Sequence, residues 1–146
     1  MPTVHDLLVS KGSPKVHTIA PGATVLDAVE AMNSRKIGAL LVMEEGRVMG
    51  IFTERDVLQR VIGQMLRPSA TPVSEVMSAN VVCVEPHTDL DEVSTIMKDR
   101  RIRHVPVCDG QGNLLGMISI GDVNAVHASH REAALNYLND YVYGRV

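Results

Sequence analysis

Short apolar runs separated by turn residues mark two predicted β-hairpins in this chain. Residues 37–43 (IGALLVM) are followed by the turn residues EEG and then by a second apolar run, VMGIF. Residues 102–108 (IRHVPVC) are followed by DGQGN and then by LLGMIS. Paired apolar runs of this length, joined by a glycine-containing turn, are typical of antiparallel strands. We therefore expect one hairpin in each half of the chain.

A helical pattern precedes each hairpin. Apolar residues recur there at spacings of three and four positions, which predicts a helix with one buried face. These residues are Val25, Ala28, Val29 and Met32 in the first half and Leu90, Val93, Ile96 and Met97 in the second. Thr24 and Asp89 stand at the expected N-cap positions. After each hairpin, helical spacing resumes over 56–62 and from 122 onwards.

The two halves are copies of one unit. Residues 16–42 align with residues 81–107 at a spacing of 65, and one inserted residue then changes the spacing to 66. The matched identities are Pro21 with Pro86, Met32 with Met97, Arg35 with Arg100, Ile37 with Ile102, Val42 with Val107, Gly50 with Gly116 and Asp56 with Asp122. Each copy predicts the order strand, helix, strand, strand, helix, with the first strands at 16–19 and 81–84.

The predicted fold class is α/β (α+β), with two tandem repeats packed in pseudo-two-fold symmetry. We expect residues 1–65 to form the first repeat with a short N-terminal helix, and residues 66–71 to form a linker. Residues 72–146 then form the second repeat, which ends in a long helix. A repeat of about 60 residues buries too little surface to be comfortable alone, so the repeats should pack together around a shared cleft.

Composition and charge exclude several classes of function. The net charge is -3 and the sequence pI is about 6.0, so neither nucleic acid nor an anionic membrane is an expected partner. No apolar run is long enough to span a membrane, and the N-terminal residues lack the apolar core of a signal peptide, so we expect a cytoplasmic protein.

Cys83 and Cys108 are far apart in sequence and are interpreted as reduced core thiols. We expect no metal site, because His127 and His130 are better explained as a solvated helix face.

One seven-residue pattern occurs in both copies, as GIFTERD at 50–56 and GMISIGD at 116–122. Thr53 and Ser119 stand at the end of a strand just before a helix, so each hydroxyl could be a plain N-cap. Capping accounts less well for the aspartates, because glutamate would serve equally. Alternatively, Asp56 and Asp122 accept the two hydroxyls of a ribose, while the neighbouring hydroxyl faces a phosphate.

The arrangement resembles a tandem pair of cystathionine beta-synthase (CBS) domains, a Bateman module, over nearly the whole chain. In that family the pattern Gly, apolar, x, Ser/Thr, x, x, Asp marks an adenosine site, and both copies match it. The resemblance implies that each site takes its two halves from opposite repeats. One set is Ser119 and Asp122 with Ala20, Val25, Ile37, Gly38 and Ala39, and the other is Thr53 and Asp56 with Glu85, Leu90, Ile102, Arg103 and His104.

Positive charge near the expected cleft is concentrated in the second copy. Arg55 adjoins Asp56, and the run DRRIRH places Arg103 and His104 on a strand that otherwise reads apolar. A cation on a half-buried strand is costly unless it is paired, and a phosphate would pair well. Arg103 could instead pair with an acid such as Asp99 or Asp109, or face solvent. The first copy has Gly38 and Ala39 at the positions of Arg103 and His104, so the two sites should not be equivalent.

The resemblance implies a regulatory sensor that binds AMP, ADP, ATP or NAD(H) between its repeats. The apolar stripe Ala134, Leu135, Leu138 and Val142 on the last helix favours a homodimer, and the output would pass to a regulated protein that the sequence does not identify. The alternatives are a purely structural dimerisation module and a nucleotide-metabolising enzyme. We expect no enzyme activity, because the sequence has no phosphate-binding P-loop, GxGxxG motif or paired nucleophile and base.

Overall fold

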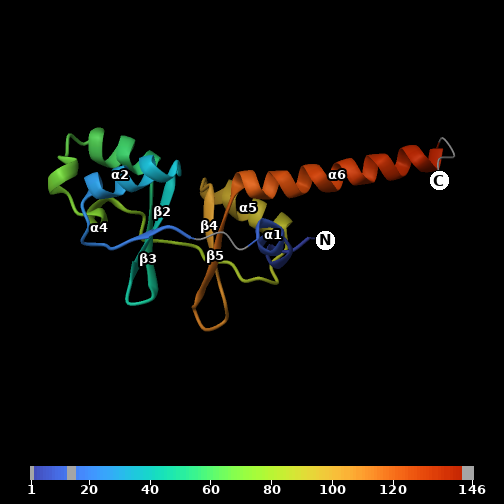
Figure 1. The fold of residues 1–146 in the computed structure, drawn as a ribbon, viewed down its shortest axis with the longest axis horizontal. Helices are drawn as coiled ribbons and strands as arrows, with labels where there is room; N and C mark the ends of the chain where they lie inside the picture. Colours follow the sequence, from blue (N-terminus) through green and yellow to red (C-terminus); the bar gives the residue numbers. More distant parts are fainter. Residues whose placement is uncertain (1, 13–15, 143–146) are drawn as a thin grey trace.

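The structure, a computed structural model, describes residues 2–12 and 16–142 and is built from helices and two small sheets (Figure 1). The first half contains β1 (Thr18–Ile19), α2 (Val25–Arg35), β2 (Ala39–Glu44), β3 (Arg47–Thr53), α3 (Glu54–Asp56) and a π-helical turn η1 (Val57–Ile62). The second half contains α5 (Leu90–Arg100), β4 (His104–Cys108), β5 (Leu114–Ser119) and α6 (Ile120–Val142). Before these halves come α1 (Val4–Lys11) and α4 (Val73–Val76), and the 3-10 turn η2 (Pro68–Ala70) leads into α4.

Both predicted hairpins are present, and they match in register. In the first sheet β2 pairs antiparallel with β3 and parallel with β1, and in the second sheet β4 pairs antiparallel with β5. Each hairpin carries one register shift, after Val42 in β2 and after Val107 in β4. These two residues are matched in the sequence repeat, so the irregularity is a property of the repeated unit. The predicted strand at 81–84 is wrong: only Val84 forms a bridge, with Val107.

The helices that precede the hairpins begin and end as a repeat would require, with one exception. Thr24 accepts a hydrogen bond from the Asp27 amide, so this predicted N-cap is confirmed. Asp89 also occupies the expected N-cap position, of α5, but its side chain makes no capping hydrogen bond. Both helices end in a left-handed residue with φ of 55°, Lys36 in one and Arg101 in the other.

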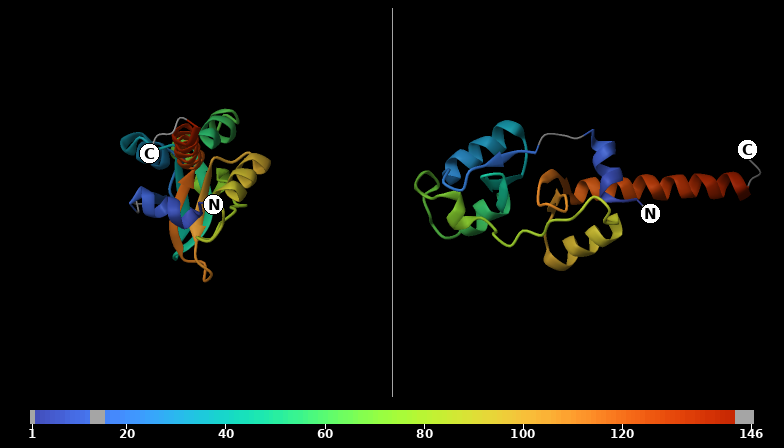
Figure 2. Two further views of the ribbon diagram at one scale, coloured as in Figure 1. Left: turned by 90° about the vertical axis from the view of Figure 1, so that its right-hand side faces the viewer. Right: turned by 90° about the horizontal axis from the view of Figure 1, so that it is seen from below.

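Each of the two short helices that precede a repeat packs on the other repeat: α1 on the second and α4 on the first. The amides of Val4 and Leu90 connect α1 to the second repeat, through Thr88 O (2.9 Å) and Pro2 O (3.0 Å). In the same way the amides of Val25 and Val73 connect α4 to the first repeat, through Thr71 O (2.9 Å) and Ala23 O (2.8 Å). Figures 1 and 2 show α1 in the half of the molecule that holds α5 and α6, and α4 in the half that holds α2. Each repeat is therefore completed by the segment that lies outside it.

Two hydrophobic cores follow from this exchange. The first core joins residues of α2, β2 and β3 to the fully buried Val73 and to Val76 of α4. The second core joins residues of α5, β4 and β5 to Val4 and Leu7 of α1. Since each core needs a segment from the other half, neither repeat closes its core by itself.

The last helix leaves the body of the protein. Helix α6 has 23 residues, about 34 Å at the rise of an α-helix, and its C-terminal half extends past α1 (Figures 1 and 2). Leu135, Tyr137 and Leu138 are exposed on this half. Among the described residues, no helix combines the length and the apolar character that a membrane span needs.

Candidate functional site

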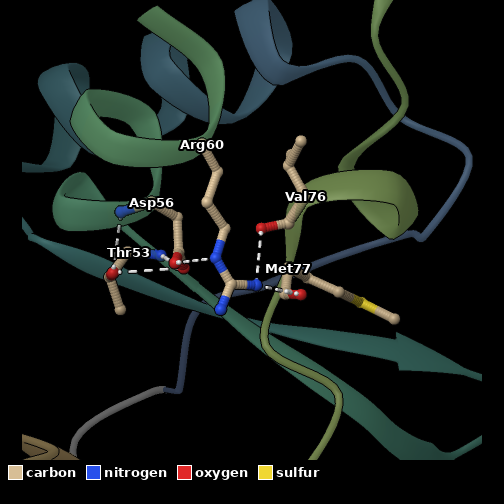
Figure 3. A network of polar contacts seen from close by, with 5 residues as sticks. All are labelled: Thr53, Asp56, Arg60, Val76 and Met77. Carbon is tan, nitrogen blue, oxygen red and sulfur yellow. Dashed lines mark hydrogen bonds and ion pairs between the residues drawn. The ribbon is translucent and has the colours of Figure 1, made fainter. Parts of the chain in front are cut away.

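The repeated hydroxyl and aspartate form a reciprocal capping box at the start of α3 (Figure 3). The Asp56 amide donates to Thr53 Oγ1 (3.3 Å), and the Thr53 amide donates to Asp56 Oδ2 (3.0 Å). The Thr53 hydroxyl also donates to Asp56 Oδ2 (3.2 Å). Asp56 is only 7% exposed. Its Oδ2 accepts both of the hydrogen bonds that Thr53 donates. The other oxygen, Oδ1, remains for a different partner.

Arg60 lies against that second oxygen. Its Nε is 3.6 Å from Asp56 Oδ1, and the same guanidinium donates to Met77 O (3.0 Å) and Val76 O (3.5 Å) at the end of α4 (Figure 3). The two carbonyl groups hold the guanidinium in place independently of Asp56. Arg60 was not among the residues expected from the sequence, although its position four residues after Asp56 on a helix is a usable signal.

The second copy repeats the box with a different cation. The Ser119 amide donates to Asp122 Oδ2 (2.9 Å), and the Asp122 amide donates to Ser119 Oγ (3.1 Å). Lys11 Nζ, from the last turn of α1, donates to the same Asp122 Oδ2 at 2.8 Å. Burial works to raise the pKa of Asp122, but the bonds from Lys11 and Ser119 outweigh it and hold this pKa below its ordinary value.

Capping therefore explains more of the pattern than the sequence suggested. Two further boxes, Thr3 with Asp6 and Thr24 with Asp27, also use aspartate at the third helical position. The argument that capping accounts poorly for the aspartates is accordingly wrong, because this chain uses aspartate for that purpose elsewhere. The capping interpretation of Thr53 and Ser119 is confirmed, and a ligand-binding role would be an additional one.

A cavity of about 570 Å³ lies between the two repeats beside the first box. The residues that line it come from both hairpins, from both boxes and from the irregular segment after α4. Of the residues expected from the sequence, it collects Gly38, Thr53, Arg55, Asp56, Ile102, Arg103, His104 and Ser119. Residues that the sequence did not single out are Gln59, Arg60, Ser78, Asn80, Val81 and Val82, among others. The segment 78–82 forms no helix or strand apart from an isolated bridge at Ser78, and its place at the cavity was not predicted from the sequence.

Seven residues of the two expected sets do not line this cavity: Ala20, Val25, Ile37, Ala39, Glu85, Leu90 and Asp122. Ala39 is buried within β2, and Ala20 is exposed beyond β1. Asp122 is half-buried and faces Lys11. Of the two site halves expected from the resemblance, the structure brings together Thr53 and Asp56 with residues 102–104, whereas the set around Asp122 contributes only Gly38 and Ser119 to the cavity.

The charge around the cavity is mainly positive. Its lining carries the guanidinium groups of Arg55, Arg60, Arg100, Arg101 and Arg103, against the carboxylates of Glu54 and Asp56. Arg103 makes no ion pair with any residue in the described part of the chain, and Asp109 instead accepts hydrogen bonds from Gln111 and Asn113. The expected alternative in which Arg103 pairs with an aspartate is therefore not realised. Arg103 is exposed, as the solvent-facing alternative expects, and it precedes β4 rather than lying on the strand. Excess positive charge in a cavity of this size suits an anionic small molecule.

His104 enters the cavity as a neutral group near physiological pH. Burial is the main cause of its lowered pKa, and the adjacent Arg103 lowers the pKa further. Asp122 and Glu54 act in the opposite direction but do not compensate. A neutral imidazole offers one donor and one acceptor, so His104 can contact a polar ligand without adding charge.

The two cysteines and His127 lie outside the cavity lining. Cys83 is exposed rather than in the core, and it lies beside the buried Cys108, so the expectation of two separate core thiols is wrong for Cys83. Burial, with a contribution from Cys83, raises the pKa of the Cys108 thiol to about 12. His127 Nε2 lies 3.1 Å from Asp91 Oδ1. Within the part of the chain that the structure describes, no group of three potential metal ligands occurs.

Comparison with known proteins gives consistent matches over both repeats. A family model described as "CBS domain" matches residues 4–63 and 73–127. The chain is 38% identical over 151 residues to the CBS domain-containing protein CBSX3, mitochondrial, of Arabidopsis thaliana, covering 97% of this chain and 72% of that protein. A solved CBS-domain protein from Burkholderia ambifaria superposes with a TM-score of 0.84 at 38% identity, covering 88% of this chain and 95% of that one.

A more distant solved structure carries ligands. The CBS domain pair of protein MJ0100, 21% identical with a TM-score of 0.75, covers 89% of this chain and 98% of its own. It was solved in complex with 5'-methylthioadenosine and S-adenosyl-L-methionine. At this identity the likeness concerns the fold alone.

Proposed function

Because this chain belongs to the CBS domain family through two tandem repeats, we propose that it is a regulatory module that binds an adenine nucleotide between them. The observation that carries the proposal is the cavity that Asp56 of one repeat lines together with Arg103 and His104 of the other. A carboxylate and several guanidinium groups around one cavity suit the two polar parts of a nucleotide, a sugar diol and a phosphate.

The lining assigns a role to each part of such a ligand. Asp56 Oδ1 accepts a hydrogen bond from a ribose hydroxyl, because the local box occupies only Oδ2. Arg100, Arg101 and Arg103 provide guanidinium groups for phosphate oxygens. Ile51, Val81, Val82 and Ile102 provide apolar surface for the base. AMP, ADP, ATP and the adenylate half of NAD(H) all carry these three parts, and the adenosine ligands of the MJ0100 pair share the base and the sugar.

Calorimetric titration with AMP, ADP, ATP and NADH tests the proposal. Replacing Asp56 by Asn should weaken binding at least about tenfold, because a charge-assisted hydrogen bond is lost. Asp27→Asn is the matched control, since Asp27 forms the same kind of capping box on α2 but does not line the cavity. Equal affinity in wild type and Asp56→Asn would refute the assigned role of Asp56.

A thermal-shift screen separates this proposal from a purely structural module. A ligand that binds only the folded state raises the melting temperature, by an amount that grows with the ratio of ligand concentration to Kd. We expect a rise with at least one adenine nucleotide, and a smaller rise for Arg103→Ala if phosphate contacts contribute. A melting temperature that no adenine ligand changes would favour the structural alternative. Turnover of the added nucleotide during the assay would instead favour an enzyme.

We also propose that the protein forms a homodimer through α6. The exposed Leu135 and Leu138 lie on the half of the helix that extends beyond the body, and Ala134 is exposed beside them. The side chain of Val142, also expected in this stripe, lies outside the described residues. Two copies of one helix can pair antiparallel about a two-fold axis, so that each stripe covers its equivalent. Light scattering should give a dimer for the wild type and a monomer for Leu135→Asp with Leu138→Asp, and a wild-type monomer would overturn this assignment.

A further inference from the structure

Asp56 and Asp122 are equivalent in the repeat, but cations reach them from different places. Asp56 takes Arg60 from its own helix, four residues later, at 3.6 Å. In the second copy that position is Val126, which is partly buried against the second core. Asp122 instead takes Lys11 from α1, at 2.8 Å. The internal symmetry of the protein is therefore broken at the two carboxylates that carry the repeated motif.

The residue equivalent to Lys11 follows from the exchange of leading segments. A Cβ atom on Gly50 would meet Met77, and a Cβ atom on Gly116 would meet Leu8, so Leu8 and Met77 hold equivalent places. Counting three residues onwards from each gives Lys11 and Asn80. Asn80 lines the cavity beside Asp56, whereas Lys11 lies directly on Asp122. By this count one copy has a neutral amide side chain and the other an ammonium group, although α1 is still helical at Lys11 whereas α4 has ended at Val76.

The ammonium group is held firmly at Asp122. Lys11 Nζ donates both to Asp122 Oδ2 (2.8 Å) and to Met117 O (3.1 Å), and the two paired side chains are only 25% and 26% exposed. A ribose hydroxyl carries no charge, so it lacks the attraction between opposite charges that holds the Lys11 ammonium group at the Asp122 carboxylate. A sugar would therefore have to displace a stronger partner from Asp122. The Asp56 side chain is more buried, at 10% exposed, but its Oδ1 makes only the longer 3.6 Å contact with Arg60, whose guanidinium also donates to Met77 O.

We propose that Lys11 pairs with the carboxylate of Asp122 and thereby prevents Asp122 from binding a sugar. Each chain then binds one adenine nucleotide, at Asp56. Lys11 is thus the residue that decides the number of sites. This inference rests on the proposed function of the cavity. It goes beyond it by assigning different states to the two copies of the motif.

Native mass spectrometry with ATP as the probe measures the number of bound nucleotides directly. We expect one ATP per chain for the wild type and two for Lys11→Asn, which copies the residue found at position 80. Lys98→Asn is the charge-matched control, because Lys98 is exposed on α5, and it should still bind one. Adding Asp122→Asn to Lys11→Asn should return the number to one, which ties the second nucleotide to Asp122.

The outcomes separate this inference from the proposed function. Two nucleotides on the wild type, or one on a folded Lys11→Asn variant, overturn the role of Lys11 while the cavity at Asp56 stands. No nucleotide on the wild type and one on Lys11→Asn would support the role of Lys11 and refute the site at Asp56. No nucleotide on either refutes both. Because Lys11 also anchors α1, Lys11→Met serves as a second variant that keeps the length of the side chain and removes its charge, and circular dichroism confirms that both variants are folded.

Discussion

Gly50 leaves the space that Met77 occupies. A Cβ atom at Gly50 would lie 2.7 Å from Met77 Sδ and 2.7 Å from the carbonyl oxygen of Ser78. The Ser78 amide in turn donates to Ile51 O (2.9 Å), so the chain that leaves α4 is bonded across β3 at this point. The first glycine of the repeated motif is therefore required by the close approach of two backbones, and it needs no ligand to explain it.

Gly50→Ala should be strongly destabilising. The added methyl group meets a backbone oxygen that cannot move without breaking the contact with β3, so we expect a loss of about 2 kcal/mol in the free energy of unfolding. Gly116→Ala should cost less, because its nearest neighbour at 3.0 Å is a terminal methyl of Leu8, which can rotate. Gly110→Ala is the control, since no atom lies within 4 Å of its Cβ position. Urea denaturation of the three variants measures the order, and equal losses at 50 and 110 would contradict this account.

Removing the capping hydroxyls should destabilise the protein even without ligand. Thr53→Ala leaves the Asp56 amide without its acceptor and should cost about 1 kcal/mol. Thr53→Ser keeps the oxygen and should cost much less. Ser119→Ala tests the equivalent bond in the second copy. Chemical denaturation in nucleotide-free buffer is the measurement, and unchanged stability in both alanine variants would show that these caps are energetically unimportant.

A destabilising substitution in α1 should reduce the stability of the second repeat rather than that of the first. Leu7 is 2% exposed and packs in the second core, so Leu7→Ala should cost about 2–4 kcal/mol. Hydrogen exchange should show loss of amide protection in β4 and β5 before β2 and β3. Val9→Ala on the same helix is the control, because Val9 is 65% exposed. Loss of protection first in β2 and β3 would mean that α1 does not complete the second core in solution.

Acidification should destabilise the protein through His104. Its pKa is lowered in the folded state, so the stability it contributes is present above the ordinary histidine range and is lost as the pH falls through that range and below. The melting temperature of the wild type should therefore fall between pH 7 and pH 5 by more than that of His104→Gln. Substituting the exposed His5 by Gln should leave the wild-type dependence unchanged. An identical pH dependence in wild type and His104→Gln would contradict a buried, neutral imidazole.

The repeat and its hairpins were readable from sequence because they depend on local pattern. Apolar runs with turn residues between them place β2 with β3 and β4 with β5, and the spacing of 65 pairs Val42 with Val107 at the register shifts. The predicted strand at 81–84 failed because an apolar run specifies a strand only when a neighbouring strand is present along its length. Val84 alone finds such a partner.

The candidate site could be predicted only in part from the sequence. The positions of Thr53, Asp56, Arg103 and His104 around one cavity agree with the expected set. The contact between Lys11 and Asp122 was not predictable, since the two residues are more than a hundred positions apart in the chain. The proximity of Cys83 to Cys108 was not predictable for the same reason, because the two residues are far apart in the chain. The bridge between Val84 and Val107 brings them together.

The amino-acid sequence by itself determined the duplicated unit, its hairpins with the helices before and after them, and the paired motif, because these follow from periodicity and from short-range turn and capping chemistry. Tertiary structure alone decided that α1 and α4 exchange repeats, that one motif faces a cationic cavity, and that the other is held by Lys11. These outcomes depend on which surfaces bury each other when the two halves close, and contacts between distant residues leave no periodic trace in the chain.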